Sequence, residues 1–229
     1  MPEQGVPFHC ASYLYDARAS PIGCVHANDF PRSWGYTLVG VVNLTRIYTR
    51  TGDAGTTRLG DMSETSKNDP RLHAYADVDE ANAHLGMALA HDLQESVRGV
   101  LIHVQNDLFD VGADFCTPVV ENPEHPPLRI TQEYVDRLET WCDEYNAELP
   151  KLRSFILSGG TPAAAQLHVA RTVVRRAERS AWAAYDVYSE TMNPVAIRYL
   201  NRLSDLVFIL ARHANRENGD VLWVPGGER

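Results

Sequence analysis

The stretch LHVARTVVRRAERSAW, residues 167–182, decides the fold of this chain. Small and apolar residues recur in it every three or four positions, the spacing that places side chains on one face of an α-helix. They are Leu167, Ala170, Val174, Ala177 and Ala181. Because charged residues fill many of the positions between them, the stretch predicts an amphipathic helix, from about Pro162 to Tyr185, that packs against other helices.

Four further segments carry the signals of long helices. The expected ranges are 70–91, 95–116, 131–150 and 193–215. Asn-Asp-Pro at 68–70 opens the first of them, with Asp69 as N-cap and proline at the first helical position. Strand alternation of useful length is absent from the sequence, except for a short extended piece around 44–49. The chain is therefore predicted to be an all-α bundle of five long helices.

Composition and charge exclude several functional classes. The chain is 44% hydrophobic and 22% charged, which is ordinary for a globular protein. Its net charge of −9 argues against a general nucleic-acid binder, because a phosphate backbone requires a basic surface. No apolar run approaches the roughly 20 residues that span a bilayer, so we expect no membrane insertion. The four cysteines form no CxxC pair and predict reduced thiols in a cytoplasmic protein.

The two ends of the chain differ from its middle. Residues 1–40 mix proline, glycine and aromatics without periodicity, and they lack the pattern of a signal peptide. We expect them to be a poorly ordered extension before a helical domain over 41–229. Translation from an upstream start and a tail that docks on a neighbouring subunit are the alternatives. In the C-terminal DVLWVPGGER, Trp223 is expected to pack on the bundle rather than to cover a cofactor pocket.

The segment TRTGDAGTTRLGD, residues 49–61, is too polar to belong to a core. Its glycines, Gly52, Gly55 and Gly60, allow the backbone to approach a ligand closely, and its backbone N–H groups can bind an anion. The chain has no Gly-Lys dipeptide, which excludes a P-loop, and no Glu-x-x-His pair, which excludes a di-iron bundle. From spacing alone, an anion-binding segment and a flexible loop both remain open.

Charged side chains on the 167–182 helix point away from its apolar stripe. Arg171 and Arg175 are four residues apart, so their charges repel each other on one face. A bound anion would stabilise both. The alternative is a solvated surface on which Glu178 pairs with Arg175.

Polar residues on two other helices also need an explanation. Asn201, Ser204 and Asp205 lie beside 207–211, which is apolar all round and therefore expected to be covered. Buried polar groups require partners, which a subunit interface or a ligand would supply. Asp79 lies among apolar positions of the first helix, where an arginine partner is expected.

Three segments resemble the PduO-type ATP:cob(I)alamin adenosyltransferases in order, spacing and helical setting. They are RIYTRTGDAGTTRLGD (46–61), FILSGGTPAAAQLHVARTVVRRAER (155–179) and YLNRLSDLVFILAR (199–212). The resemblance covers about residues 44–215 and implies a ferritin-like five-helix bundle. It also implies a homotrimer with active sites between subunits, which transfers the 5′-deoxyadenosyl group of ATP to cob(I)alamin and releases triphosphate. ATP, cobalamin and Mg²⁺ are the implied cofactors.

The resemblance also implies roles for individual residues. The triphosphate would be wrapped by Thr49, Arg50, Thr51, Gly52, Asp53, Thr56 and Thr57. The other nucleotide-binding positions are Lys67, Arg175, Arg176, Glu178, Arg179 and Asn201. Asp79 and Arg171 match an ion pair that crosses the interface, and Phe155 matches an aromatic ring beneath the corrin. Ser158 stands where the family usually has proline before a Gly-Gly turn.

The implied chemistry needs no general base, since cob(I)alamin is itself a strong nucleophile. Arg175, Lys67 and Mg²⁺ would stabilise the departing triphosphate. Phe155 would displace the lower axial ligand of cobalt and so make reduction of Co(II) accessible. A reductase and an adenosylcobalamin-dependent mutase are the expected partners. The alternatives are a non-catalytic carrier that delivers adenosylcobalamin to a mutase and a purely structural helical oligomer.

Overall fold

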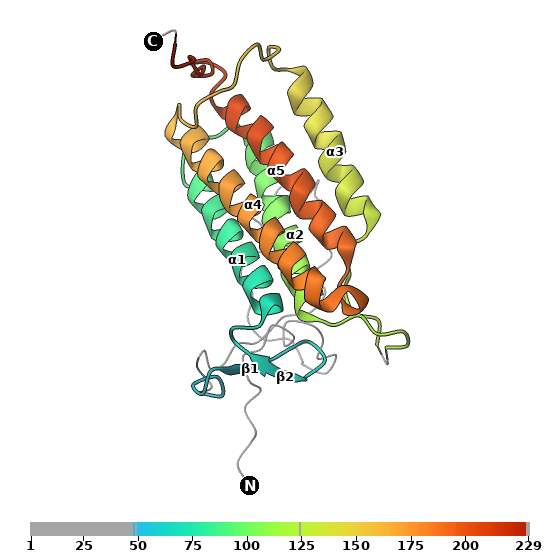
Figure 1. Ribbon diagram of the computed structural model, residues 1–229. Helices are drawn as coiled ribbons and strands as arrows, with labels where there is room; N and C mark the ends of the chain where they lie inside the picture. Colours follow the sequence, from blue (N-terminus) through green and yellow to red (C-terminus); the bar gives the residue numbers. More distant parts are fainter. Residues whose placement is uncertain (1–47, 49, 124, 228–229) are drawn as a thin grey trace, which may run out of the picture.

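The computed structural model describes Tyr48, residues 50–123 and residues 125–227. Within this part of the chain lie five α-helices, a 3₁₀ turn and one β-hairpin. The helices are α1 (Pro70–Leu89), α2 (Glu95–Cys116), α3 (Gln132–Ala147), α4 (Pro162–Tyr188) and α5 (Pro194–Ala214); the turn is η2 (Ser189–Thr191). The hairpin pairs β1 (Thr56–Arg58) with β2 (Glu64–Ser66). The predicted five-helix bundle is confirmed, and the hairpin lies at its lower end in Figure 1.

Capping residues fix where three of the helices begin. The side chains of Asp69, Thr161 and Asn193 accept hydrogen bonds from backbone N–H groups in the first turns of α1, α4 and α5. Each of these residues precedes a proline, whose missing N–H costs nothing at the first helical position. Thr131 precedes α3 as predicted, but its side chain makes no capping hydrogen bond.

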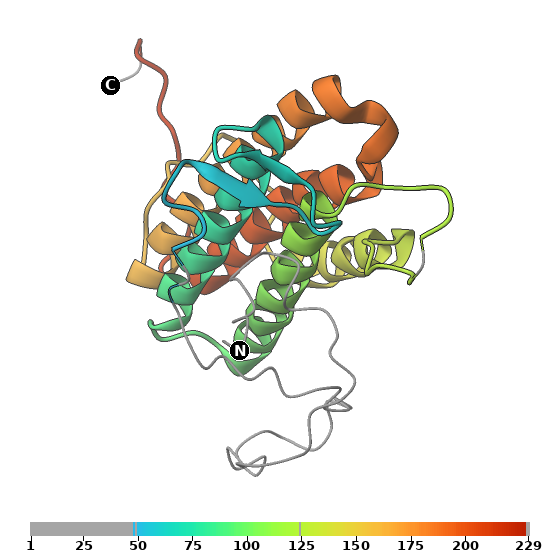
Figure 2. The ribbon, with the colours of Figure 1, turned by 90° about the horizontal axis from the view of Figure 1, so that it is seen from below.

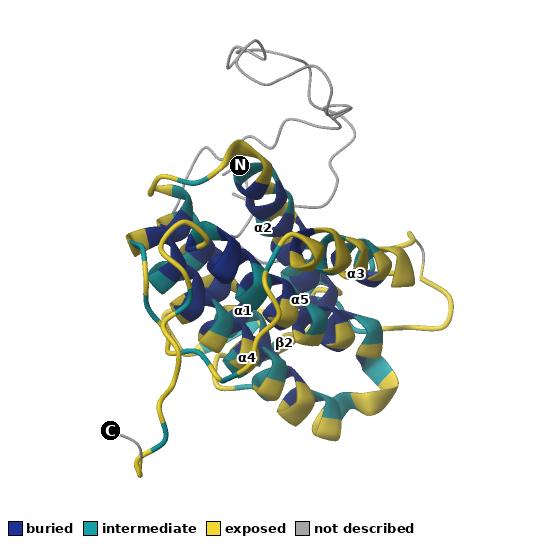
Figure 3. Cartoon of the chain, turned by 90° about the horizontal axis from the view of Figure 1, so that it is seen from above, coloured by how far each residue is buried: buried dark blue, intermediate teal, exposed yellow. Residues whose placement is uncertain are grey.

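α4 packs between α1 and α5, and its predicted apolar stripe is fully buried. α4 contacts α1 and α5, α1 also contacts α2, and α3 packs on α5. Figure 3 shows the buried residues gathered on the inward faces of the helices. None of the described helices combines the length and the apolarity needed to cross a bilayer. The predicted extension over 1–40 lies outside the described residues, as does most of the extended piece expected at 44–49.

The sequence did not predict the hairpin. Thr57 pairs with Thr65 at its centre, in antiparallel register. Its turn docks on the end of α2, where the backbone N–H of Gly60 donates to the carbonyl of Cys116 (2.8 Å). A Cβ at Gly60 would lie 2.1 Å from Oγ1 of Thr117, so only glycine allows this approach. Strands of three residues are too short to show alternation, which explains the missed prediction.

Candidate active site

A cavity of about 300 Å³ lies at the lower end of the bundle, between the segment before β1 and the hairpin. We call it the loop pocket. It is lined by Tyr48, Arg50, Thr51, Gly52, Asp53, Thr56, Thr57, Arg58, Glu64 and Lys67. Seven predicted site residues are therefore brought together, while Thr49 lies outside the described residues. Tyr48, Arg58 and Glu64 also line the pocket but were not predicted. Arg58 and Glu64 line it because they pair with each other in the hairpin.

The backbone of the loop pocket is tightly turned. The N–H of Gly55 donates to the carbonyl of Gly52 (3.2 Å), and the N–H of Lys67 donates to the carbonyl of Gly55 (2.9 Å). The ammonium of Lys67 lies against Gly52, since a Cβ built there would be 2.9 Å from Nζ. Arg50 has a φ of 61°, and its guanidinium lies 5.6 Å from the centre of the Tyr48 ring. The pocket therefore presents several cations and a glycine-rich backbone to the same small space, an arrangement suited to phosphate oxygens.

The outer side of α4 carries arginines with few partners, which we call the arginine face (Arg171, Arg175 and Arg179). Arg175 and Arg179 are exposed, and no hydrogen bond or ion pair reaches them from the described residues. Nε of Arg171 is buried without a partner, and the guanidinium lies 5.7 Å from the centre of the Phe208 ring. Burial, and then the charge of Arg175, lower the pKa of Arg171. This repulsion is the kind that a bound anion relieves.

Glu178 and Arg176 are already engaged within the chain. Glu178 accepts a hydrogen bond from the Asn201 amide (3.0 Å). It forms no ion pair with Arg175 among the described residues, so that part of the alternative is wrong. Arg176 binds Asp77 (3.3 Å) and Glu80 on α1. The hydrogen bond to Glu80 raises the pKa of Arg176. Arg176 therefore joins α4 to α1, whereas Arg175, one residue earlier, points to an open surface.

Two expectations about buried polar residues are wrong: the apolar surroundings of Asp79 and the outside partner of Ser204. Asp79 is exposed on α1. Its ion pair with Arg171 is expected across a subunit interface and stays a prediction, since none forms within the described chain. Ser204 is buried, with 3% of its surface exposed, but its hydroxyl donates to the carbonyl of Asn201 in the preceding turn (2.8 Å). It needs no outside partner. Asn201 and Asp205 are exposed, so of these three polar residues Ser204 alone is buried.

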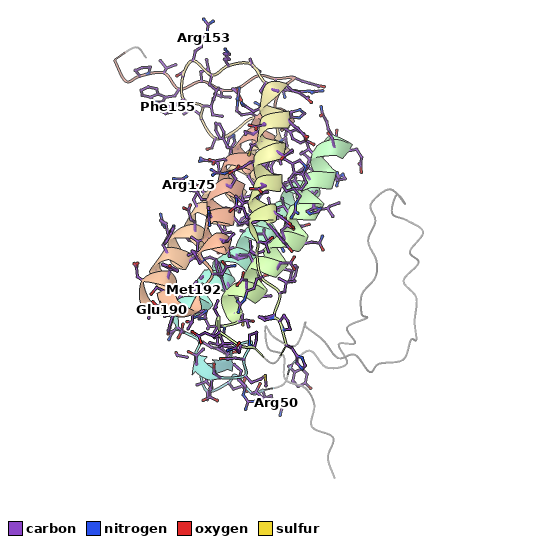
Figure 4. The ribbon with its side chains drawn as sticks, turned by 90° about the vertical axis from the view of Figure 1, so that its right-hand side faces the viewer. Arg50, Arg153, Phe155, Arg175, Glu190 and Met192 are labelled. Atoms are coloured by element: carbon purple, nitrogen blue, oxygen red, sulfur yellow. The ribbon has the colours of Figure 1, made fainter. Side chains whose placement is uncertain are left out.

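Phe155 lies between α3 and α4 at the upper end of the bundle, with 77% of its surface exposed (Figure 4). Its ring meets that of Trp223 edge to face, with centroids 6.0 Å apart. The N–H of Trp223 donates to the Phe155 carbonyl and that of Leu157 to the Val221 carbonyl, both at 2.8 Å. Trp223 was expected to pack on the bundle; this is wrong, because 221–223 pair with the Phe155 segment instead.

The turn after Ser158 is formed without the usual proline. Gly160 has a φ of +106°, which favours glycine, and the following N–H, of Thr161, donates to Oδ1 of Asn215 (3.1 Å). The connection into α4 is thus fixed by Asn215 from the end of α5.

The three parts of the predicted site are spread along the bundle. The loop pocket has no lining residue from α4 or α5. Figure 4 places Arg50 at the lower end, Arg175 along α4 and Phe155 at the upper end. Figure 2, which looks up from the hairpin, shows the hairpin lying across the lower ends of the helices. A single chain therefore does not bring the loop pocket and the arginine face into one cavity.

A second cavity, of about 420 Å³, lies at the opposite end of α4 from the loop pocket. It is lined by residues of the α1–α2 connection, the start of α4 and the end of α5, including His91, Thr161, His213 and Arg216. None of the predicted site residues borders it. The loop pocket is smaller, but it is lined by seven of the predicted site residues, and we take it as the candidate site.

Comparison with known proteins identifies the family of the chain. The family model for cobalamin adenosyltransferase matches residues 47–214. The corrinoid adenosyltransferase of Mycobacterium tuberculosis (strain ATCC 25618 / H37Rv) is 65% identical over 189 residues, covering 82% of this chain and 97% of that protein. That of Bacillus subtilis (strain 168) is 41% identical over 179 residues, covering 76% and 89%.

Comparison with solved structures finds proteins of the same family. A variant of the PduO-type ATP:corrinoid adenosyltransferase from Lactobacillus reuteri, complexed with cobalamin and ATP, is similar with a TM-score of 0.71 and 36% identity. The match covers 79% of this chain and 100% of that one. This chain belongs to the cobalamin adenosyltransferase family.

Proposed function

We propose that the chain transfers the 5′-deoxyadenosyl group of ATP to cob(I)alamin, giving adenosylcobalamin and triphosphate. The observation that carries the proposal is the loop pocket, where Arg50 and Lys67 meet a glycine-rich backbone. The arginine face of α4 supports it, because its guanidiniums lack anionic partners among the described residues. Both regions suit a ligand with a long run of phosphate oxygens.

The reaction is an alkyl transfer in which Co(I) is the nucleophile. The cobalt electron pair forms the Co–C bond at the 5′ carbon, the bond from that carbon to oxygen breaks, and its electrons leave with triphosphate. Since Co(I) carries no proton to remove, no general base is required. The described lining of the loop pocket contains no histidine, and its cations are suited to stabilising the leaving group.

Mg²⁺ fits this site as a partner of the triphosphate. The described residues contain no cluster of three His, Cys, Asp or Glu side chains that could hold a metal ion alone. Mg²⁺ is commonly bound through substrate phosphates and one or two carboxylates. Asp53 and Glu64 line the loop pocket and could supply these carboxylates. The ion would add positive charge beside the leaving oxygens.

We infer that the complete site forms between two copies of the chain in a homotrimer. The loop pocket of one subunit would face Arg175 and Arg179 of its neighbour, and Asp79 would pair with Arg171 across the same contact. The exposure of Asp79 and the unpartnered Nε of Arg171 support this arrangement. A ring of three identical head-to-tail contacts repeats one such site at each interface.

Phe155 would lie beneath the corrin, on the side opposite ATP. Its ring has no donor atom, so it can exclude a lower axial ligand from cobalt without replacing it. The electron that converts Co(II) to Co(I) would come from a separate reductase, and an adenosylcobalamin-dependent mutase would receive the product. We place this reaction in the cytoplasm.

The catalytic proposal is tested with ATP, Mg²⁺ and chemically reduced cobalamin while the corrin spectrum is recorded. A catalyst converts the spectrum to that of adenosylcobalamin. A carrier binds the corrin without converting it, and a structural oligomer does neither.

The shared site is tested by co-expressing two inactive variants, Lys67→Ala and Arg175→Ala. If each site takes its loop from one chain and its α4 from the next, random mixing leaves about a quarter of the sites intact in a head-to-tail ring. Activity should then return to about a quarter of the wild-type value. If the mixed protein stays inactive, the loop and the helix act within one chain and the intersubunit proposal fails.

A further inference from the structure

Asp69 connects the loop pocket to the bundle through both oxygens of its carboxylate. Oδ1 accepts the backbone N–H of Arg71 (2.8 Å), which caps α1. Oδ2 accepts the hydroxyl of Thr65 on β2 (2.8 Å) and that of Tyr188 at the end of α4 (2.7 Å). We call Asp69, Thr65 and Tyr188 the Asp69 junction. One side chain thus ties the hairpin to two helices that are far apart in the sequence.

Arg71 supports this junction from within the protein. Only 2% of its surface is exposed, and its guanidinium lies 4.8 Å from the centre of the Tyr188 ring. The guanidinium also donates to the carbonyls of Phe115 (3.1 Å) and Thr191 (3.3 Å) and to Oγ1 of Thr191 (2.8 Å). Tyr188 is therefore held at its ring by Arg71 and at its hydroxyl by Asp69.

The charge state strengthens the junction. Burial disfavours the ionised form of Asp69, but the hydrogen bonds from Tyr188, Arg71 and Thr65 outweigh it and lower the pKa of the carboxyl. The hydrogen bond from Tyr188 to Asp69 also raises the pKa of the Tyr188 hydroxyl. At neutral pH an ionised acceptor therefore meets neutral hydroxyl donors. Such charge-assisted hydrogen bonds are roughly twice as strong as bonds between neutral groups.

The position of Lys67 gives the junction a functional meaning. Lys67 lies midway between Thr65 and Asp69, and its backbone N–H is bound to Gly55. Because the side chains of Thr65 and Asp69 are joined, the backbone is fixed on both sides of Lys67. We propose that the Asp69 junction is a positioning group that holds Lys67 against the glycine-rich segment for ATP. This inference rests on the proposed role of the loop pocket in ATP binding.

Other contacts hold the hairpin when the junction is weakened. Leu59 is buried in a small apolar cluster with Leu72 and Cys116, and Gly60 is hydrogen-bonded to the end of α2. Loss of one hydroxyl from the junction should therefore loosen the loop pocket without unfolding the chain.

The test uses Tyr188→Phe and Thr65→Val, each of which removes one hydroxyl and keeps the shape of the side chain. We expect each to raise KM for ATP about threefold to fivefold, the effect of losing one partly exposed hydrogen bond, with the KM for cobalamin within about twofold of wild type. Thr65→Ser keeps a hydroxyl and should restore the ATP value. Tyr185→Phe is the matched control, since no hydrogen bond of its hydroxyl is formed within the described residues.

A direct measurement of ATP affinity without cobalamin tests the positioning role separately from the proposed reaction. Unchanged ATP affinity in both variants, or an equal loss in Tyr185→Phe, would overturn the positioning role. A wild-type protein that binds ATP but converts no cobalamin would instead overturn the proposed reaction, while the comparison of ATP affinities would still decide the role of the junction.

Discussion

The loop pocket and the arginine face of α4 organise their charges in opposite ways. In the loop pocket, the cations Arg50, Arg58 and Lys67 lie near the carboxylates of Asp53 and Glu64. All five belong to one segment of about twenty residues, whose backbone is hydrogen-bonded to itself. On α4, Arg175 and Arg179 are exposed without partners among the described residues, and Arg171 has an orphaned buried nitrogen. The loop pocket is formed by a single chain, whereas the arginine face would, in our proposal, receive its anions from another molecule.

Replacing Arg175 should have the largest effect. In Arg175→Ala we expect the rate to fall about 100-fold and the ATP requirement to rise, as for other preorganised donors to a leaving group. Because this guanidinium has no partner in the described chain, the free energy of unfolding should change by less than about 0.5 kcal/mol. Steady-state kinetics and thermal unfolding measure the two quantities. Arg198→Ala, an exposed arginine on α5, is the control, and an unchanged rate for Arg175→Ala would remove that residue from the site.

Removing the ring of Phe155 should have the next largest effect. Phe155→Ala is expected to lower turnover from cob(II)alamin about tenfold or more, since a lower axial ligand could then reach cobalt and make reduction of Co(II) less accessible. ATP affinity should not change, because in the proposed site the corrin separates Phe155 from ATP. Turnover and ATP binding are measured side by side, with the exposed Phe109→Ala on α2 as control. Equal losses of both quantities would contradict the role given to Phe155.

Filling the space at Gly52 should have a moderate effect. A Cβ there would lie 2.9 Å from Nζ and 3.0 Å from Cε of Lys67, so Gly52→Ala should push the flexible lysine aside. We expect KM for ATP to rise about fivefold, the cost of weakening one polar contact, with little change in stability. Gly159→Ala, where the added Cβ meets open space, is the control. A wild-type KM in Gly52→Ala would show that ATP does not need Lys67 in this position.

The smallest effect is a pH dependence at the Asp69 junction. Folding lowers the pKa of Asp69 below its ordinary value of 3.8, so Asp69 stabilises the fold above that pH and loses this effect as pH falls through the folded pKa. Tyr188→Phe should destabilise the protein by less than about 1 kcal/mol near pH 7, because the partly exposed group is screened by water. The difference should vanish in strong acid. Urea unfolding across pH measures it, and a constant difference would contradict the assignment to Asp69.

Local patterns were sufficient for the helices and for half of the candidate site. The apolar period of α4 and the capping signals before α1 and α5 depend on neighbouring residues, so the sequence contains them in full. The same holds for the loop pocket, where Gly52 and Lys67 lie within one short segment.

Contacts between distant segments could not be predicted in this way. The partners of Arg176 are on α1, about a hundred residues earlier, and nothing in the spacing of α4 distinguishes Arg176 from Arg175. Trp223 pairs with the Phe155 segment through backbone groups, which every residue carries. Ser204 was misread because its hydroxyl is satisfied by its own helix, a local solution that polarity alone does not reveal.

The edge-to-face contact between Phe155 and Trp223 gives the protein a built-in optical probe. The indole of Trp223 lies 6.0 Å from the Phe155 ring, which we propose to lie under the corrin. When the corrin covers Phe155, the indole therefore emits close to a strongly absorbing macrocycle. Quenching of its fluorescence would therefore report arrival and departure of the corrin at this end of the bundle, independently of any chemistry at cobalt.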